Sequence, residues 1–342
     1  MGLRSYIVKR IFYMIALVFF VITINFFVFM LMPGDPASML VNPQSRNVRE
    51  EMERLNQAWG FNDPVHIKYY KYAINMLTWN FGTSFMTGHV IANDIAWRLP
   101  YTLFLIGGST ILSMVIGVLL GVLAAYKRGT RLDDTNVVLA LIFYSLPVFW
   151  MAMMFLLVFS KQLKWLPMGQ AYPVEWLLGS PPPAASLNIL GATVAIPSGT
   201  EIVERIRHAI LPLATLTLFQ YGGWLLLTRA TMLEALTEDY VLTAKAKGVK
   251  TRTVLLKHAL KNASLPLITN AALAFGFMVS GAIITESVYN WPGMGRWIFE
   301  SIDLRNYPVM QAVFYIIGLC VIIANFIADL LYGIIDPRIK YD

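Results

Sequence analysis

Residues 101–126 read YTLFLIGGSTILSMVIGVLLGVLAAY, and none of these residues is charged. About 20 apolar residues in a helix are enough to cross a hydrocarbon layer roughly 30 Å thick. Inside a bilayer a helix satisfies its backbone hydrogen bonds internally, whereas an isolated extended segment does not. This stretch therefore predicts a transmembrane helix and a fold that has lipid as part of its solvent.

Five further stretches have the same character, and none of the six carries an ionisable residue near its centre. The whole chain is 57% apolar and only 14% charged, whereas soluble domains carry about 25% charged residues. The sequence thus predicts an all-α polytopic membrane protein. The six predicted transmembrane helices are residues 11–32, 101–126, 136–159, 209–227, 265–285 and 309–331. The first is longer than the apolar core of about 7–15 residues found in a signal peptide, so we expect it to remain uncleaved.

The basic residues predict the orientation of the chain. Its net charge is +7, but a nucleic-acid-binding protein gathers its basic residues on one exposed face, and here they separate the apolar stretches. With the amino terminus inside, the cytoplasmic segments hold 15 Lys and Arg in 67 residues, and the external segments hold 12 in 140. Lys and Arg are enriched in cytoplasmic loops. We therefore expect both termini in the cytoplasm.

Three regions are predicted along the chain. Residues 1–32 form the cytoplasmic amino terminus and the first helix, residues 33–100 form an extracytoplasmic loop region, and residues 101–342 form the transmembrane core. The core contains an external loop (160–208), which includes Pro181–Pro183 and looks irregular, and a cytoplasmic loop (228–264).

The first external region contains signals for two short helices. Asp63 followed by Pro64 is typical of an N-cap and a first helical position, and Tyr69, Tyr72, Ile74 and Leu77 would supply the apolar face of the helix. Residues 90–99 predict a second short helix that ends before Pro100.

Gly117 and Gly121 place two small residues four apart on one face of the second predicted span. Such spacing allows a neighbouring helix to approach closely. The alternative is that they reflect the ordinary glycine content of membrane helices, and the pattern alone leaves both open.

The cytoplasmic loop contains signals for two short helices in an elbow. Thr237 is a suitable N-cap, Glu238 and Asp239 complement the positive end of a helix dipole, and Gly248 is placed as the terminator. A second helix is predicted at about residues 253–262. The elbow suits docking to a partner protein, but a basic amphipathic loop lying on anionic lipid fits the same pattern.

The loop carries a resemblance that favours docking. Residues 234–248 (EALTEDYVLTAKAKG) and 258–262 (HALKN) resemble the coupling loop of the transmembrane permeases of ATP-binding-cassette (ABC) importers, and more narrowly the B-type permease of dipeptide and oligopeptide importers. The likeness covers nearly the whole chain. It includes PGDPA at 33–37, WNFGTSF at 79–85, RLPYT at 98–102, ESVYNWPGMG at 286–295, YP at 307–308 and DPR at 336–338.

This resemblance implies the fold of a type I importer permease and a division of labour between subunits. A second permease would complete a heterodimer, two ATPase subunits would bind ATP and Mg, and an extracytoplasmic binding protein would deliver substrate in the plasma membrane of a prokaryote. This chain would bind no cofactor. The residues expected to couple it to an ATPase are Asp239, Tyr240, Ala244, Ala246, Lys247 and Gly248.

The loop departs from the general importer motif in two places. That motif begins Glu-Ala-Ala six residues before its glycine, where this chain has Leu242-Thr243-Ala244, and its later Leu-Pro is Leu260-Lys261 here. Both departures are usual in the peptide subgroup.

The remaining chemistry argues against an enzyme. The sequence contains no GxxxxGK[ST] phosphate loop, no HExxH metal motif and no Gly-x-Ser-x-Gly nucleophile elbow, so we expect neither catalysis nor a metal site. Glu286 and Trp291 are candidates for contact with the binding protein or substrate, although we favour a helix-end carboxylate facing water for Glu286. The first external loop is a stronger candidate for meeting the binding protein.

Two questions of function remain at this point. An ion-coupled secondary transporter would carry ionisable residues in mid-membrane, and these spans have none, so this alternative is remote. The cargo is expected to be peptide, with oligosaccharide as the alternative because some oligosaccharide permeases share these motifs. Aromatic residues in the external loops (Trp165, Tyr172 and Trp176) suit sugar stacking and an interfacial belt equally well.

Overall fold

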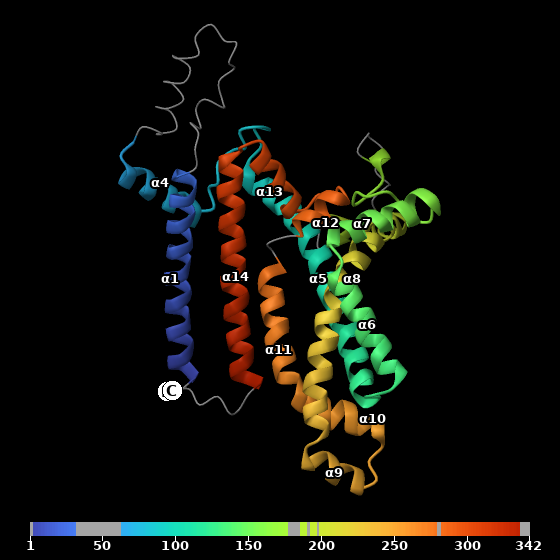
Figure 1. The fold of residues 1–342 in the computed structure, drawn as a ribbon. Coiled ribbons are helices and arrows are strands. Elements are labelled where there is room, and N and C mark those ends of the chain that lie inside the picture. The colour runs from blue at the N-terminus through green and yellow to red at the C-terminus, as the bar shows by residue number, and fades with distance from the viewer. Residues whose placement is uncertain are drawn as a thin grey trace. The chain divides into compact units, whose positions relative to one another are not determined.

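The computed structural model describes residues 3–31, 63–176, 185–189, 192–196, 198–278 and 282–335 (Figure 1). The chain divides into two compact units, one of residues 1–99 with 297–342 and the other of residues 100–296. The named helices are α1 (Leu3–Met30), α4 (Val65–Leu77), α5 (Ile91–Tyr126), α6 (Arg131–Ser145), α7 (Val148–Phe155), α8 (Gly199–Leu236), α9 (Asp239–Ala246), α10 (Thr251–Thr253), α11 (Leu260–Phe277), α12 (Ile283–Val288), α13 (Met294–Asp303) and α14 (Tyr307–Ile335).

The first unit is built on α1 packed along α14 (Figure 1). A Cβ added to Gly318 would approach Val21 Cγ1 to 2.7 Å, so glycine is needed for this close contact. Asn25 lies buried in α1 and donates to the Tyr72 hydroxyl (2.7 Å) and to the carbonyl of Gln311 (2.9 Å). One amide therefore ties α1 to both α4 and α14, and a buried polar group needs such partners.

Helix α4 differs in detail from its prediction. Pro64 is the N-cap, and its carbonyl accepts from the amides of Ile67 and Lys68. Asp63 instead pairs with Lys71 at 2.6 Å. The prediction of Asp63 as the cap is therefore wrong. Tyr72 is buried as predicted, together with Met76, but Ile74 and Leu77 are exposed.

The second unit is organised around α8, a helix of 38 residues that contacts α6, α7, α11 and α12 (Figure 1). Its amino terminus is capped by Ser198, whose hydroxyl oxygen accepts from the amide of Glu201 (3.2 Å). The predicted span at 209–227 is the middle of this helix.

Gly117 and Gly121 of α5 pack directly on α8. A Cβ on Gly117 would overlap Trp224 and lie 2.7 Å from the carbonyl oxygen of Tyr221, and one on Gly121 would lie 2.6 Å from Thr228 Cβ. Side chains at these positions would force the two helices apart. The structure thus supports the close-approach reading of the glycine pair.

The third predicted span, residues 136–159, is not one straight helix. α6 ends at Ser145, and the chain turns at Pro147 into α7 and a π-helix (Leu156–Gln162) at an angle of 98°. Proline cannot donate the hydrogen bond that would continue α6. With 15 residues, α6 is about 22 Å long, which is shorter than the hydrocarbon layer.

Four helices of the described chain are long and apolar enough to cross a membrane, or five if the bent α6–α7 pair counts as one span. They correspond to the first, second, fourth and sixth predicted spans, with the bent pair in place of the third. The fifth, at 265–285, is represented by α11, and part of it lies outside the described residues. Helix α5 continues through Pro100, so the prediction of a separate short helix ending there is wrong.

The described part of the external loop at 160–208 is more ordered than predicted. It contains a 3₁₀ turn (Val174–Trp176) and an antiparallel hairpin of β1 (Ala185–Ile189) and β2 (Ala192–Ile196), with Ala185 opposite Ile196. The prediction of an irregular loop is wrong for the hairpin. Pro181–Pro183, and the motifs at 33–37 and 336–338, lie outside the described residues.

Candidate functional site

Helix α9 projects beyond the end of α8, and within the second unit it lies at the end opposite α12 (Figure 1). α8 ends at Leu236, and Thr237 is its C-cap, donating its hydroxyl to the carbonyl of Glu234 (2.7 Å). Glu238 is the N-cap of α9, so the prediction of Thr237 as N-cap is wrong. Asp239 occupies the first turn as predicted, where a negative charge complements the helix dipole.

The end of α9 is a Schellman motif built on Gly248. This glycine has φ +72°, a left-handed conformation that glycine adopts more readily than any other residue. Its amide donates to the carbonyl of Lys245 (2.9 Å), and the amide of Val249 donates to that of Ala244 (3.2 Å). These two bonds are the pattern that ends a helix, and the predicted terminator is confirmed.

The inner face of α9 rests on a small apolar core of its own. Val241 and Ala244 are buried together with Val254 of the π-helix (Val254–Ala259), with Leu236, Tyr240 and Val249 packed around them. The Tyr240 hydroxyl also donates to the carbonyl of Ala235 (3.2 Å). Ala244 is buried and Tyr240 is half-buried, so both help to position the loop.

The outer face of α9 is open. Asp239, Ala246, Lys247 and Gly248 are exposed, and the Leu242 side chain, which is 70% exposed, lies on the same helix. Leu242 was not among the residues predicted to couple the chain to an ATPase, although it follows the buried Val241 directly and a helix directs adjacent residues to different faces. An exposed leucine on a projecting helix offers an apolar contact that the described chain leaves uncovered.

The second helix of the predicted elbow is not separate. Thr251–Thr253, the π-helix and α11 follow one another without interruption up to Phe277, so the boundary predicted at residue 262 is wrong. Asn262 lies inside the helical run, and even Pro266 does not end it.

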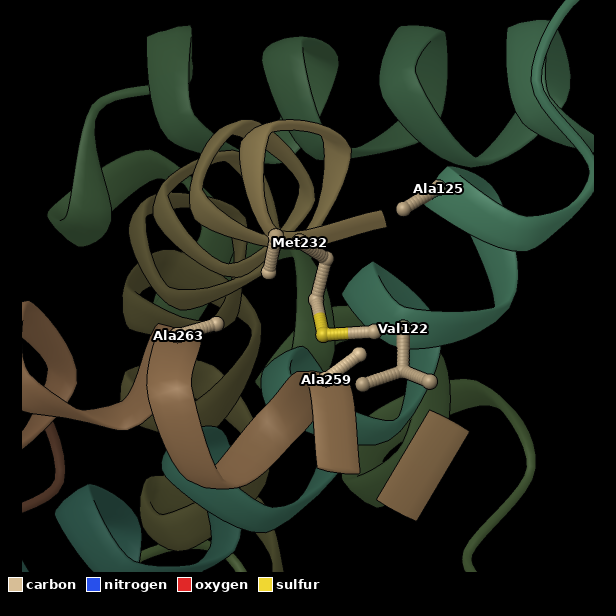
Figure 2. Packing of buried hydrophobic residues seen from close by; sticks show 6 residues of the cluster. Val122, Ala125, Met232, Ala259 and Ala263 are labelled. Atoms are coloured by element: carbon tan, nitrogen blue, oxygen red, sulfur yellow. The ribbon is translucent and has the colours of Figure 1, made fainter. Parts of the chain in front are cut away.

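The base of the loop is held by an apolar cluster and an ion pair. Figure 2 shows Met232 of α8 beside Val122 of α5 and Ala259, in a cluster completed by Ala125, Ala235 and Ala263. Arg229 of α8 donates two hydrogen bonds to Asp133 of α6 (2.7 and 2.8 Å), and this carboxylate is almost completely buried. The pair ties α6 to α8 close to the point where α9 begins. Nothing in the sequence pattern identified it, because the partners lie 96 residues apart.

The other two candidate residues lie at the opposite end of the second unit. Glu286 of α12 is 0% exposed and Trp291 is 2% exposed. Trp291 donates its indole N–H to the carbonyl of Tyr101 (3.1 Å) and stacks on Phe104. The expectation that Glu286 faces water is wrong. In this conformation both side chains are covered by the chain itself, and their predicted contact with a binding protein or substrate stays a prediction.

Glu286 is surrounded by hydrogen-bond donors of the chain. Its Oε1 accepts from the Thr102 hydroxyl and its Oε2 from the amide of Arg296, both at 2.9 Å. Burial raises the pKa of this carboxyl group, while the amide of Arg296 and the Thr102 hydroxyl act in the opposite direction. All these partners are donors, so they fit the ionised carboxylate, which only accepts hydrogen bonds.

Known proteins match the chain along nearly its full length. Residues 117–341 match the family described as "Binding-protein-dependent transport system inner membrane component", and residues 3–106 match the family "Binding-prot-dependent transport system membrane comp, N-term". This chain belongs to that family of inner membrane components. It is therefore a multi-pass inner membrane permease of an ABC import system, with a role in transport and not in catalysis.

Three curated relatives of this inner membrane component illustrate the likeness. A di/tripeptide transport system permease protein, DppB, of Pseudomonas aeruginosa is 32% identical, covering 98% of this chain and 99% of its own. The oligopeptide transport system permease protein AppB of Bacillus subtilis is 34% identical (99% and 100%). The glutathione transport system permease protein GsiC of Salmonella paratyphi A is 33% identical (98% and 99%).

Proposed function

We propose that this permease forms half of the translocation pathway of a peptide importer. The observation that carries this proposal is the full-length similarity to permeases named for dipeptides, tripeptides, oligopeptides and glutathione, all of them short peptides. The relatives' names do not favour an oligosaccharide as cargo. The complex would contain a second, related permease as a heterodimer partner.

The exposed face of α9 would dock on an ATPase subunit. Leu242 and the small side chain of Ala246 offer a contact that a groove on a partner can cover, while the separate core beneath α9 keeps the helix rigid. Two such ATPases would bind ATP and Mg, and this chain would bind no cofactor of its own. ATP-driven closure of the ATPases would move α9 and, through α8, the membrane helices.

The proposed orientation places α9 and both termini in the cytoplasm. The distribution of Lys and Arg supports this, because their density is more than twice as high in the segments assigned to the cytoplasm. The loop region that contains α4 would then face the external binding protein. Ile67, Tyr70 and Ile74 of α4 offer it exposed apolar side chains spaced along one helix face.

The composition of the complex is the first test. The chain is extracted in mild detergent by a carboxy-terminal tag, and its co-purifying proteins are identified. We expect a second permease and two ATPases with phosphate loops, and we expect the associated binding protein to bind di- to oligopeptides and not oligosaccharides. Recovery of the chain alone, under conditions that preserve other membrane complexes, would contradict the proposal.

A charge placed at Gly248 tests the docking role of the loop. Asn and Asp both tolerate a left-handed backbone, and a Cβ at this position would meet nothing within 4 Å. We expect the Gly248→Asp variant to insert into the membrane normally. Its peptide uptake should fall at least about tenfold, which corresponds to about 1.4 kcal/mol of coupling free energy between the permease and the ATPase.

Gly248→Asn is the matched control, because it has the same shape without the charge, and it should stay within about twofold of the wild type. Equal peptide uptake by the Asp and Asn variants would indicate that the loop is not part of the proposed interface with the ATPase.

A further inference from the structure

The buried carboxylate of Glu286 lies at the first turn of α13. Met294, Gly295 and Arg296 are the first three residues of that helix, and their amides have no partner inside the helix. The amide of Arg296 donates to Glu286 Oε2 (2.9 Å), and the amide of Met294 donates to Thr102 Oγ1 (2.7 Å). The Thr102 hydroxyl in turn donates to Glu286 Oε1 (2.9 Å). One carboxylate, directly and through one hydroxyl, thus accepts hydrogen bonds from two amides in the first turn of the helix.

The glycines of this turn are required by the carboxylate. A Cβ on Gly293 would overlap the carboxylate of Glu286 and lie 2.5 Å from Thr102 Oγ1, and one on Gly295 would lie 3.0 Å from Glu286 Oε2. The alternation of Gly293 and Gly295 therefore leaves the space in which a negative charge reaches a helix amino terminus, where the dipole favours it. The segment 286–295 therefore forms an anion-binding site at the start of α13, and the Glu286 carboxylate of the same chain occupies it. We call this site the seat.

This seat also joins two distant points of the chain. Residues 100–296 form the second unit, so the chain enters this unit next to Thr102 and leaves it at Arg296. Thr102 and Arg296 both bond to the same carboxylate. The entry and the exit of the second unit are thus held together by Glu286.

We propose that Glu286 is a positioning residue for transport, which makes the entry segment at Thr102 and the first turn of α13 move as one body. Any force that α9 transmits along α8 reaches both connecting segments together only if they are joined. Without the carboxylate, the two segments would be joined by the weaker neutral bonds from Met294 to Thr102 and from Trp291 to Tyr101, and ATP hydrolysis would continue with less transport. This consequence rests on the proposed function of the chain in an ATP-driven importer.

The test compares variants that differ in one atom or one group. Glu286→Gln keeps the volume but presents an amide donor to the donors of the seat, and Thr102→Val removes the hydroxyl at constant shape. Thr102→Ser restores the hydroxyl. Ser287→Ala is a neighbouring control on α12, because the Ser287 hydroxyl is buried and has no hydrogen-bond partner among the described residues.

The readouts are hydrogen exchange of the segment 290–297 and peptide uptake per ATP hydrolysed, both with the assembled complex. We expect Glu286→Gln and Thr102→Val to increase exchange and to lower the uptake ratio at least about fivefold, with complex abundance within twofold of the wild type. Thr102→Ser and Ser287→Ala should match the wild type in both measurements.

Three results would overturn the proposal: an unchanged uptake ratio, unchanged exchange at 290–297, or a loss of uptake that only follows a loss of assembled complex. Failure of the proposed function is distinguishable, because the wild-type complex would then show no peptide-stimulated ATP hydrolysis. The hydrogen exchange still reports on the seat in that case.

Discussion

Helix α9 and the turn between α12 and α13 are both short elements at the ends of the second unit, but their side chains differ in exposure to solvent. α9 leaves Leu242 70% exposed, whereas the turn buries Glu286 and Trp291 almost completely. The core beneath α9 contains only three buried side chains. At the turn, the Glu286 carboxylate, the Trp291 indole and the Tyr289 hydroxyl all have hydrogen-bond partners inside the protein.

The difference teaches that a conspicuous motif does not by itself indicate a contact surface. The segment 286–295 is rich in residues that bind ligands in other proteins, but here its charge and aromatic groups serve the chain. The surface of α9 has no such concentration of charged and aromatic groups, but it is exposed and therefore available to a partner protein. An exposed leucine on a projecting helix is a surface that a partner protein can cover.

The largest effect is expected at the sealed turn. Gly293→Ala would place a methyl group against the carboxylate of Glu286 and against Thr102 Oγ1, which disrupts the seat. Overpacking costs about 1–3 kcal/mol, and broken hydrogen bonds to a charged group add to this. We expect a loss of about 3 kcal/mol, measured as a lower thermal midpoint of the purified complex.

Gly199→Ala serves as the control, since a Cβ there meets nothing within 4 Å and the midpoint should change little. Equal thermal midpoints for the two variants would show that the turn is not tightly packed around Glu286.

A smaller but more selective effect is expected at the open helix. Leu242→Asp should leave the thermal midpoint of the isolated permease unchanged, because the side chain is exposed. It should reduce recovery of the ATPase subunits at least about tenfold, or about 1.4 kcal/mol, because charge in an apolar contact must be desolvated.

Leu242→Met keeps the apolar volume and should recover the ATPases as the wild type does. If the Leu242→Asp variant also binds the ATPase subunits normally, the exposed face of α9 is not their docking surface.

The smallest effect sharpens the comparison within α9. Asp239 is exposed in the first turn, and Asp239→Asn removes only its interaction with the helix dipole, which is worth about 0.3–1 kcal/mol at low salt. We expect peptide uptake to fall by less than about fivefold, and the difference from the wild type to shrink as salt is raised. A loss of more than tenfold that persists at high salt would indicate that Asp239 contacts the ATPase directly.

Parts of the loop could be predicted because local chemistry decides them. The left-handed position of Gly248 and the acidic first turn of α9 depend on residues within a few positions of each other. The cap at Thr237 was misplaced by one residue, because α8 continues to Leu236 and uses Thr237 for its own end. Competition between two adjacent helices for one residue is not visible in a local pattern.

The sequence alone determined the membrane fold, most of the spans and the family. Apolar stretches of about 20 residues have few alternatives in lipid, and the sequence motifs occur in a fixed order. Only the tertiary structure decided which side chains are open. The Asp133–Arg229 pair and the burial of Glu286 each depend on segments brought together from distant positions. Burial is a property of the packed chain, because it is set by which segments cover a residue and not by the residue itself.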